Sequence, residues 1–435
     1  MSTPAKPRRA GRQGTETSSA MSTATTQEAT REATTAEAAG VVPRQGWVNL
    51  AVATVGFAIN FWAWALIGPL GAFFTGRLHL SSVQTSLLVA VPVIVGSLGR
   101  IPVGAMTDRF GARIMFPLLS ALTIAPVLFV GYVAPNSYAL LLIGGFVLGL
   151  GGTTFAVGVP LVNGWFPPAK RGAALGIFGM GMGGTAISAF TTVALKDRFG
   201  LGFPFTLVAA LLAAYAVVAY ALLRVPQGRA TARGSAMRRA WETFRMPVTL
   251  QLSFLYAVGF GGFVAFSVYL PTYLKTAYGL TPGDAALRTA GFVVLAVVMR
   301  PVGGWLSDRM GPVPVLVVCF AVVAVFAGVS ALERPLAPIG TIAFLAMAAA
   351  LGAASGGVFA LVGLVAPDGK VGAVTGIVGA AGGLGGFIPP LIMGIVYGWE
   401  GNYKPGLALL ALTALVAAVY TARAMHGVGR TATTR

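Results

Sequence analysis

Charged side chains are scarce in this sequence. Only 10% of the 435 residues are charged, 56% are hydrophobic, and the mean hydropathy is +0.81. A soluble domain carries about a quarter charged residues. A chain with this balance cannot bury its apolar surface in a water-soluble core, so the composition predicts an integral membrane protein.

Cysteine, histidine and acidic residues are scarce as well. The single cysteine, Cys319, lies in an apolar run, which excludes a disulfide framework and a cysteine metal site. His79 and His426 fall in a loop and a tail, and none of the twelve acidic residues falls in the middle of an apolar stretch. The sequence shows no metal-ligand cluster, nucleophile–base pair or phosphate-binding loop, so we expect no enzyme activity, metal or cofactor.

The excess of basic residues, a net charge of +18, has a topological explanation. Lysines and arginines are dispersed in short loops and tails without a basic face that carries aromatics, so nucleic acid is not an expected partner. With a cytoplasmic N-terminus, the majority lie on the cytoplasmic side, which places both termini there in a multi-pass plasma-membrane protein. The outer side then holds Arg77, Lys196, Arg198, Lys275, Arg288, Arg334 and Lys404.

Twelve apolar stretches are each close to the roughly 20 residues that cross a bilayer as a helix. They cover residues 47–75, 84–106, 114–134, 138–164, 172–194, 203–224, 249–274, 288–306, 313–332, 338–366, 372–397 and 404–424. The fold expected is all-α, with two six-helix halves in the lipid bilayer. The parts are a disordered cytoplasmic tail (1–46), a first half (47–224), a cytoplasmic linker (225–247), a second half (248–424) and a cytoplasmic tail (425–435).

The two halves repeat one another at an offset of 200 residues. The first motif pairs Arg100, Gly104, Asp108, Arg109 and Gly111 with Arg300, Gly304, Asp308, Arg309 and Gly311. The second pairs Pro167, Lys170, Gly172, Ala173, Gly176, Ile177, Gly179 and Gly183 with Pro367, Lys370, Gly372, Ala373, Gly376, Ile377, Gly379 and Gly383. A parallel duplication of this kind predicts pseudo-symmetric halves with a substrate held between them near the bilayer midplane.

Arg100 and Arg300 are the charges inside these apolar spans. An arginine at mid-bilayer depth costs about 2.5–3.5 kcal/mol on insertion scales, and two facing cations also repel. An anion between them relieves both penalties, and the planar guanidinium fork suits a planar oxyanion. A snorkelling or helix-capping role is the alternative, but the equivalent positions and the lack of an acidic partner favour substrate contact.

The motif Gly104-x-x-x-Asp108-Arg109-x-Gly111-x-Arg113 resembles the loop signature of the major facilitator superfamily. A degenerate copy runs from Gly304 through Asp308 and Arg309 to Gly311. The resemblance implies twelve helices that work by alternating access. It also implies a gating latch made by Asp108, Arg109, Arg113, Asp308 and Arg309.

A narrower resemblance is to the nitrate/nitrite porter family. It rests on one arginine in the second span and one in the eighth, and on the glycine-rich segment from Gly376 to Phe387. It implies that Tyr256, Phe260 and Phe155 surround the anion, and backbone groups near Gly179 and Gly379 are expected to face it too. In the fifth span Met182 stands where the family pattern has asparagine, which keeps cyanate or a small carboxylate open as the substrate.

The residues and the resemblance together predict a monomeric secondary transporter of a small monovalent oxyanion, nitrate or nitrite first. No span carries a carboxylate or histidine that could move a proton. An empty carrier would hold two unpaired cations, so we expect exchange of one anion for another. Proton symport through the substrate's own proton or a water chain stays open, as does an anion sensor without transport.

Overall fold

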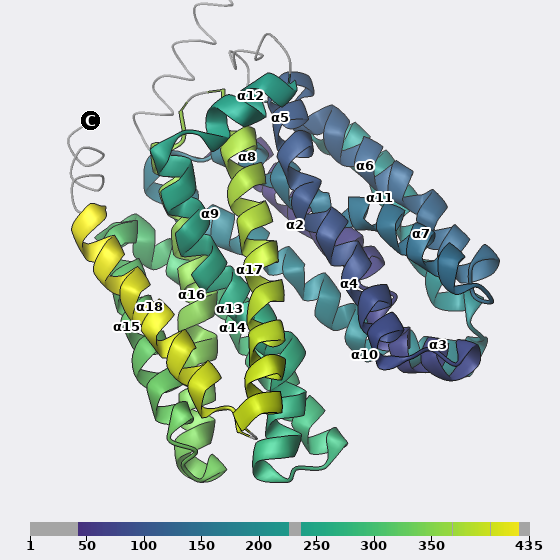
Figure 1. The fold of residues 1–435 in the computed structure, drawn as a ribbon. Coiled ribbons are helices and arrows are strands. Elements are labelled where there is room, and N and C mark those ends of the chain that lie inside the picture. The colour runs from purple at the N-terminus through teal and green to yellow at the C-terminus, as the bar shows by residue number, and fades with distance from the viewer. Residues whose placement is uncertain (1–41, 226–235, 368, 401, 426–435) are drawn as a thin grey trace, which may run out of the picture. The chain divides into compact units, whose positions relative to one another are not determined.

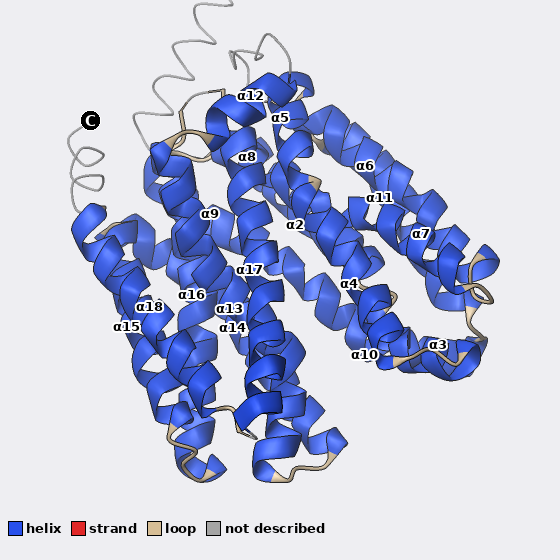
Figure 2. Ribbon diagram, viewed as in Figure 1, coloured by secondary structure: helices blue, strands red, loops and turns tan. Residues whose placement is uncertain are grey.

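The computed structural model describes residues 42–225, 236–367, 369–400 and 402–425, and all regular secondary structure in these ranges is helical (Figure 2). The chain divides into two units, Met1–Arg44 and Gln45–Arg435. Most of the predicted N-terminal tail, the first part of the predicted linker and nearly all of the C-terminal tail lie outside the described residues. Apart from Arg44, the first residue of α2, the helices described below belong to the second unit.

The expected spans are found as helices. Among the described residues, eleven helical segments are long and apolar enough to cross a membrane, and the expected eleventh span contains the shorter apolar segment Val371–Gly386. The first set is α2 (Arg44–Trp64), α3 (Gly71–Leu78), α4 (Ser82–Leu98), α5 (Arg100–Phe110), α6 (Ala112–Leu128), α7 (Tyr138–Leu148), α8 (Phe155–Trp165), α9 (Pro168–Gly179), α10 (Gly184–Phe199) and α11 (Gly202–Leu222). The second set is α13 (Pro247–Tyr278), α14 (Pro282–Met310), α15 (Pro312–Ala331), α16 (Thr341–Val365), α17 (Val371–Glu400) and α18 (Lys404–Ala424).

Spans of the first half are interrupted where those of the second half continue. Gly99 separates α4 from α5, and 3-10 turns at Gly149–Thr154 and Met180–Gly183 separate α7 from α8 and α9 from α10. Each turn is rich in glycine, which lacks the Cβ that restricts other residues. A 3-10 turn within a helical span often marks a functional hinge, and all three breaks lie next to predicted site residues.

The two halves meet along two equivalent helix pairs, α5 with α17 and α9 with α14. Glycines allow the backbones to touch at both contacts. A Cβ added to Gly372 would lie 2.5 Å from the carbonyl oxygen of Gly104, and one added to Gly304 would collide with the carbonyl oxygen of Gly172. These four glycines are two pairs related by the 200-residue offset, so the sequence repeat corresponds to a pseudo-symmetric interface.

The predicted linker contains a helix, α12 (Ala236–Phe244), which the sequence analysis did not anticipate. Ala240 is buried against Ala105 of α5 and Ala373 of α17. The linker helix therefore contacts both halves at one of their two contacts.

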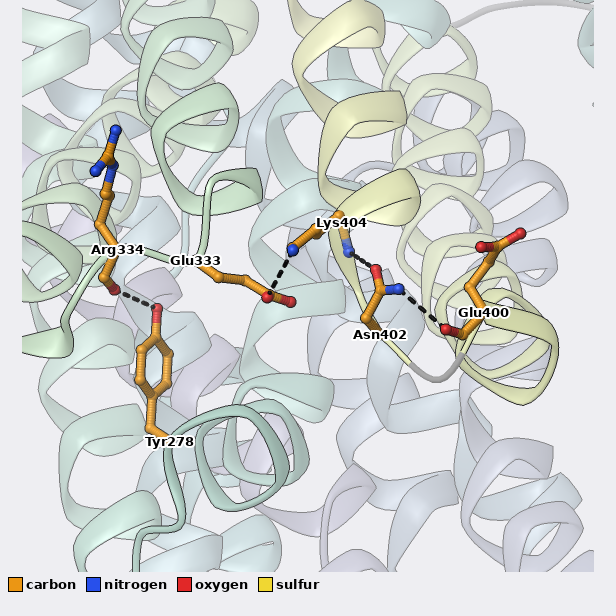
Figure 3. A network of polar contacts seen from close by, with 6 residues as sticks. All are labelled: Tyr278, Glu333, Arg334, Glu400, Asn402 and Lys404. Carbon is orange, nitrogen blue, oxygen red and sulfur yellow. Dashed lines mark hydrogen bonds and ion pairs between the residues drawn. The ribbon is translucent and has the colours of Figure 1, made fainter.

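A polar network joins the ends of several helices in the second half (Figure 3). Glu333, after α15, forms an ion pair of 3.2 Å with Lys404 at the start of α18. The hydroxyl of Tyr278, at the end of α13, donates to the carbonyl oxygen of Arg334 at 3.3 Å. The structure thus gathers at one end Arg334 and Lys404, both predicted to lie on the outer side.

Candidate functional site

Arg100 is the first residue of α5, and its side chain is buried with 2% exposure. Its Nε donates to the carbonyl oxygen of Gly152 at 3.0 Å, and its Nη1 donates to that of Gly379 at 2.8 Å. The guanidinium lies 5.5 Å from the ring centre of Phe155 and 5.8 Å from that of Phe61. Arg100 is therefore held by a carbonyl from each half and by aromatic faces, which attract cations.

Arg300 lies in α14 and is 3% exposed. Its Nη1 donates to the carbonyl oxygen of Gly179 at 3.1 Å and contacts the Sδ atom of Met182. Its Nη2 donates to the hydroxyl of Tyr256 at 3.1 Å, and the guanidinium lies 5.3 Å from the ring centre of Phe260. One carbonyl, one thioether and one phenol thus surround this cation.

Each arginine reaches across the interface to a glycine carbonyl of the other half. The Arg100 guanidinium donates to the carbonyl oxygen of Gly379, and the Arg300 guanidinium donates to that of Gly179. The two bonds are therefore equivalent under the 200-residue repeat, with each half supplying one donor and one acceptor. Among the described residues, no carboxylate lies within ion-pair distance of either guanidinium. Buried cations require hydrogen-bond acceptors, and in this structure neutral dipoles supply them.

Aromatic rings connect the two arginines. Tyr256 stacks on Phe260 with ring centres 4.8 Å apart, and it lies parallel to Phe155 at 6.4 Å. Phe359 of α16 meets both Phe155 and Tyr256 edge to face, each at 4.7 Å. The structure thus brings together all seven residues predicted for substrate binding, because Arg100 lies on Phe155 and Arg300 bonds to Tyr256.

Three residues of this cluster were missed by the sequence analysis: Phe61, Gly152 and Phe359. Each is an ordinary residue of an apolar span and carries no charge or motif. The repeat offered one signal, because Phe359 lies in the span equivalent to the one that contains Phe155.

The two predicted gating aspartates lie at the contacts between the halves. The carboxylate of Asp108 accepts hydrogen bonds from the backbone N–H groups of Gly372 and Ala373, both at 2.9 Å. That of Asp308 accepts from Gly172 and Ala173, both at 2.7 Å. Gly372 and Ala373 lie in the first turn of α17, where free N–H groups and the helix dipole favour an anion.

The three predicted gating arginines lie apart from these contacts. Arg109, Arg113 and Arg309 are exposed. They lie over the rings of Phe110, Tyr220 and Trp305, at 5.1, 5.8 and 4.1 Å from the ring centres. The described contacts between the halves are made by the aspartates rather than by these arginines.

An apolar cavity of about 290 Å³ lies elsewhere in the second half, between α13, α17 and α18. Its lining includes Phe254, Phe266, Tyr273, Pro389 and Thr413, and neither Arg100 nor Arg300. A cavity of this character suits an apolar group. It is separate from the arginine cluster.

Comparison with known proteins agrees with this architecture. The family model described as Major Facilitator Superfamily matches residues 53–390 and 252–431. The chain is 51% identical over 377 residues to the "Probable nitrate/nitrite transporter NarK2" of Mycobacterium tuberculosis, which covers 86% of this chain and 95% of that relative. It is 36% identical over 372 residues to the "Nitrite extrusion protein" of Bacillus subtilis, which covers 86% and 93%.

Among solved structures, the human organic anion transporter MFSD10 (TETRAN) has the same fold. The TM-score is 0.71 at 14% sequence identity, and the match covers 87% of this chain and all of that one, 100%. The helical spans, the internal repeat, the loop signature and these matches lead to one conclusion. The chain is a multi-pass membrane protein that belongs to the Major Facilitator Superfamily.

Proposed function

We propose that this chain is a secondary transporter of a small monovalent oxyanion, nitrate or nitrite first, that works by alternating access. Arg100 and Arg300 bind the anion between the two halves. The observation that carries the proposal is the pair of buried guanidinium groups, one from each half, with neutral acceptors and no described acidic partner. The names of the relatives at 51% and 36% identity support the choice of anion.

The energetics of the site favour an anionic ligand. A cation removed from water loses several kcal/mol of solvation, and a carbonyl dipole offsets less of this loss than a full negative charge. A planar oxyanion offers oxygen acceptors to both guanidinium forks, and the rings of Phe155, Tyr256 and Phe260 supply flat walls. We therefore assign substrate contact to these five residues and to the backbone of Gly179 and Gly379.

The crossed arginine–carbonyl bonds also bear on coupling. They join the two halves, so separating α5 from α17 and α9 from α14 with no anion bound would remove acceptors from two buried cations. A bound anion supplies those acceptors and lets the contacts open. Exchange of one anion for another follows, because the return movement of the empty carrier carries this penalty.

In the same proposal, Asp108 and Asp308 stabilise the closed contacts. Arg109, Arg113 and Arg309 mark the cytoplasmic membrane surface, with both termini on that side and the chain acting as a monomer in the plasma membrane. We assign these three arginines to membrane topology and gating, and they do not belong to the anion-binding pair.

Thermal unfolding of the purified protein tests the binding assignment. Nitrate and nitrite should raise the unfolding temperature, and Arg100→Gln or Arg300→Gln should abolish this response. Each variant removes charge-assisted hydrogen bonds of about 1.5–3 kcal/mol, or roughly 10- to 100-fold in affinity. Arg113→Gln, at an exposed position, is the matched control and should respond as the wild type does. A full nitrate response in the Arg100→Gln/Arg300→Gln double variant would refute the site.

Transport is tested in proteoliposomes. Vesicles loaded with nitrite should take up nitrate without a pH gradient, whereas strict dependence on an imposed gradient would contradict exchange. Binding without flux would identify a sensor.

A different small anion is the second candidate, and Met182 is the observation that favours it. Its thioether occupies one N–H of Arg300, and sulfur is a weaker acceptor than an amide oxygen. Adding cyanate, formate and chloride to the unfolding panel separates the candidates. A larger shift with cyanate or formate than with nitrate would move the assignment to that anion.

A further inference from the structure

The linker helix α12 lies at the boundary of the membrane. It ends at Phe244, and the span of α13 begins at Pro247. The three Cα–Cα steps from Phe244 to Pro247 span at most about 11 Å, so the helix cannot lie far from the lipid headgroups. Figure 1 shows α12 lying across the ends of α5 and α17.

The two faces of α12 differ in chemistry. Ala240 and Thr243, one helical turn apart, are buried with 3% and 0% exposure, and Ala240 packs on both halves. Trp241 and Phe244, also one turn apart, are 56% and 45% exposed, and their rings stack at 6.0 Å. The buried face fixes the helix on the protein, which leaves the aromatic face outward.

Basic side chains flank the exposed aromatics. Arg245 lies 4.9 Å from the ring centre of Trp241. Arg238 is exposed and forms an ion pair of 3.0 Å with Glu242, which also lies 4.0 Å from Lys370. With one acid among three bases, this surface carries net positive charge.

We propose that the exposed face of α12, with Arg238, Trp241 and Phe244, and the adjoining Arg245 bind anionic lipid headgroups. The leaflet is the one on the side of α12, which is cytoplasmic in the proposed topology. Tryptophan and phenylalanine insert at the headgroup boundary, and arginines beside them attract anionic lipid. This assignment is independent of the transported anion.

Because α12 packs on both halves, its binding to lipid bears on the contact between α5 and α17. Ala240 touches α5 and α17 together, and Glu242 pairs with Lys370 beside the start of α17. A helix held on the membrane surface therefore covers the α5–α17 contact from outside.

Fluorescence quenching of the full chain in vesicles tests the proposal. The protein is reconstituted in phosphatidylcholine alone and in an equal mixture with phosphatidylglycerol, each with brominated acyl chains. The chain has 7 tryptophans, so the signal of Trp241 is taken as the difference between the wild type and Trp241→Phe. Phosphatidylglycerol should increase the quenching of Trp241, and added salt should reduce the increase.

Removal of the two arginines provides the decisive comparison. In Arg238→Gln/Arg245→Gln the apparent affinity for the phosphatidylglycerol surface should fall roughly fivefold for each arginine. The control is Arg198→Gln/Arg334→Gln, which removes two exposed arginines predicted to lie on the opposite side and should behave as the wild type does. An unchanged phosphatidylglycerol response in Arg238→Gln/Arg245→Gln would overturn the proposal. So would a Trp241 signal quenched by aqueous iodide but by neither lipid, which would leave this face to a soluble partner.

Discussion

Replacing Asp308 by asparagine should loosen the contact between α9 and α14. The carboxylate accepts two backbone N–H bonds, from Gly172 and Ala173, both at 2.7 Å. An asparagine side chain keeps one oxygen acceptor and turns an NH₂ donor toward the second N–H group. The bond that remains is made to a neutral oxygen, and the variant loses one charge-assisted hydrogen bond outright.

The size of the effect follows from that single bond. A hydrogen bond to a charged group contributes about 1.5–3 kcal/mol, and the partial exposure of Asp308 favours the lower part of this range. A loss of about 1.5–2 kcal/mol shifts the equilibrium between closed and open contacts by roughly 10- to 30-fold. The ratio of closed to open contacts should fall by this factor, and the population of open contacts should rise by it.

A buried cysteine introduced at the α5–α17 contact reports the opening of the halves. Ala105 has 0% exposure and packs on Ala240 and Ala373. In a Cys319→Ala/Ala105→Cys background, the rate of labelling by a water-soluble maleimide should rise roughly 10- to 30-fold when Asp308→Asn is added. Glu333→Gln, in the polar network at the opposite end of α15 from Asp308, is the control and should leave the rate unchanged (Figure 3).

The comparison with Asp108→Asn decides whether the halves move as units. Asp108 makes the equivalent pair of bonds to Gly372 and Ala373. If the halves rock as rigid bodies, either aspartate variant should expose the cysteine at position 105. A rise with Asp108→Asn alone would refute this reasoning, because the α9–α14 contact would then open without the α5–α17 contact.

Two further predictions concern the interface and the site. Gly104→Ala should lower the free energy of unfolding by about 1–3 kcal/mol, because the new Cβ collides with the carbonyl oxygen of Gly372. The loss should be measured as a lower unfolding temperature. Gly328→Ala, where the described neighbours leave open space, is the control and should cause no loss. Without nitrate, Tyr256→Phe should destabilise the protein by about 1–3 kcal/mol, because Arg300 Nη2 loses an acceptor at 3.1 Å. Nitrate should restore part of this loss. Equal unfolding temperatures for wild type and Tyr256→Phe without nitrate would contradict this role.

Much of the site was predictable because its central residues break a pattern. A charge in an apolar span is visible in any sequence, and the 200-residue offset doubled the signal for Arg100 and Arg300. What the sequence could not predict is which groups satisfy them. The bonds to Gly379 and Gly179 depend on helices of opposite halves meeting face to face, and every glycine offers the same carbonyl.

The features of the fold that the sequence did not predict are also those that the hydropathy pattern does not show. The breaks at Gly99, Gly149–Thr154 and Met180–Gly183 leave the hydropathy of each span unchanged, so a pattern based on apolar runs predicts continuous helices. The helix α12 was hidden for the opposite reason, since its length of 9 residues and polar composition resemble a loop. Its alternation of Ala240 and Thr243 with Trp241 and Phe244 was the available signal.

The repeat and its exceptions divide the residues of the site into two groups. The arginines, the aspartates and the contact glycines all have an identical partner 200 residues away, and they make the contacts between the halves. The aromatic residues do not obey the repeat: Tyr256, Phe260 and Phe155 correspond to Gly56, Asn60 and Ser355.

This division fits the proposed alternating access on one small anion. The contacts between the halves must break and reform as either half moves, so equivalent residues on both sides give each state a similar energy. A single planar anion does not itself follow the two-fold relation between the halves. Its faces that the guanidinium groups do not contact need other side chains beside them. Substitutions at the repeated residues should therefore alter the rate of opening. Substitutions at Tyr256, Phe260 or Phe155 should alter the choice of anion instead.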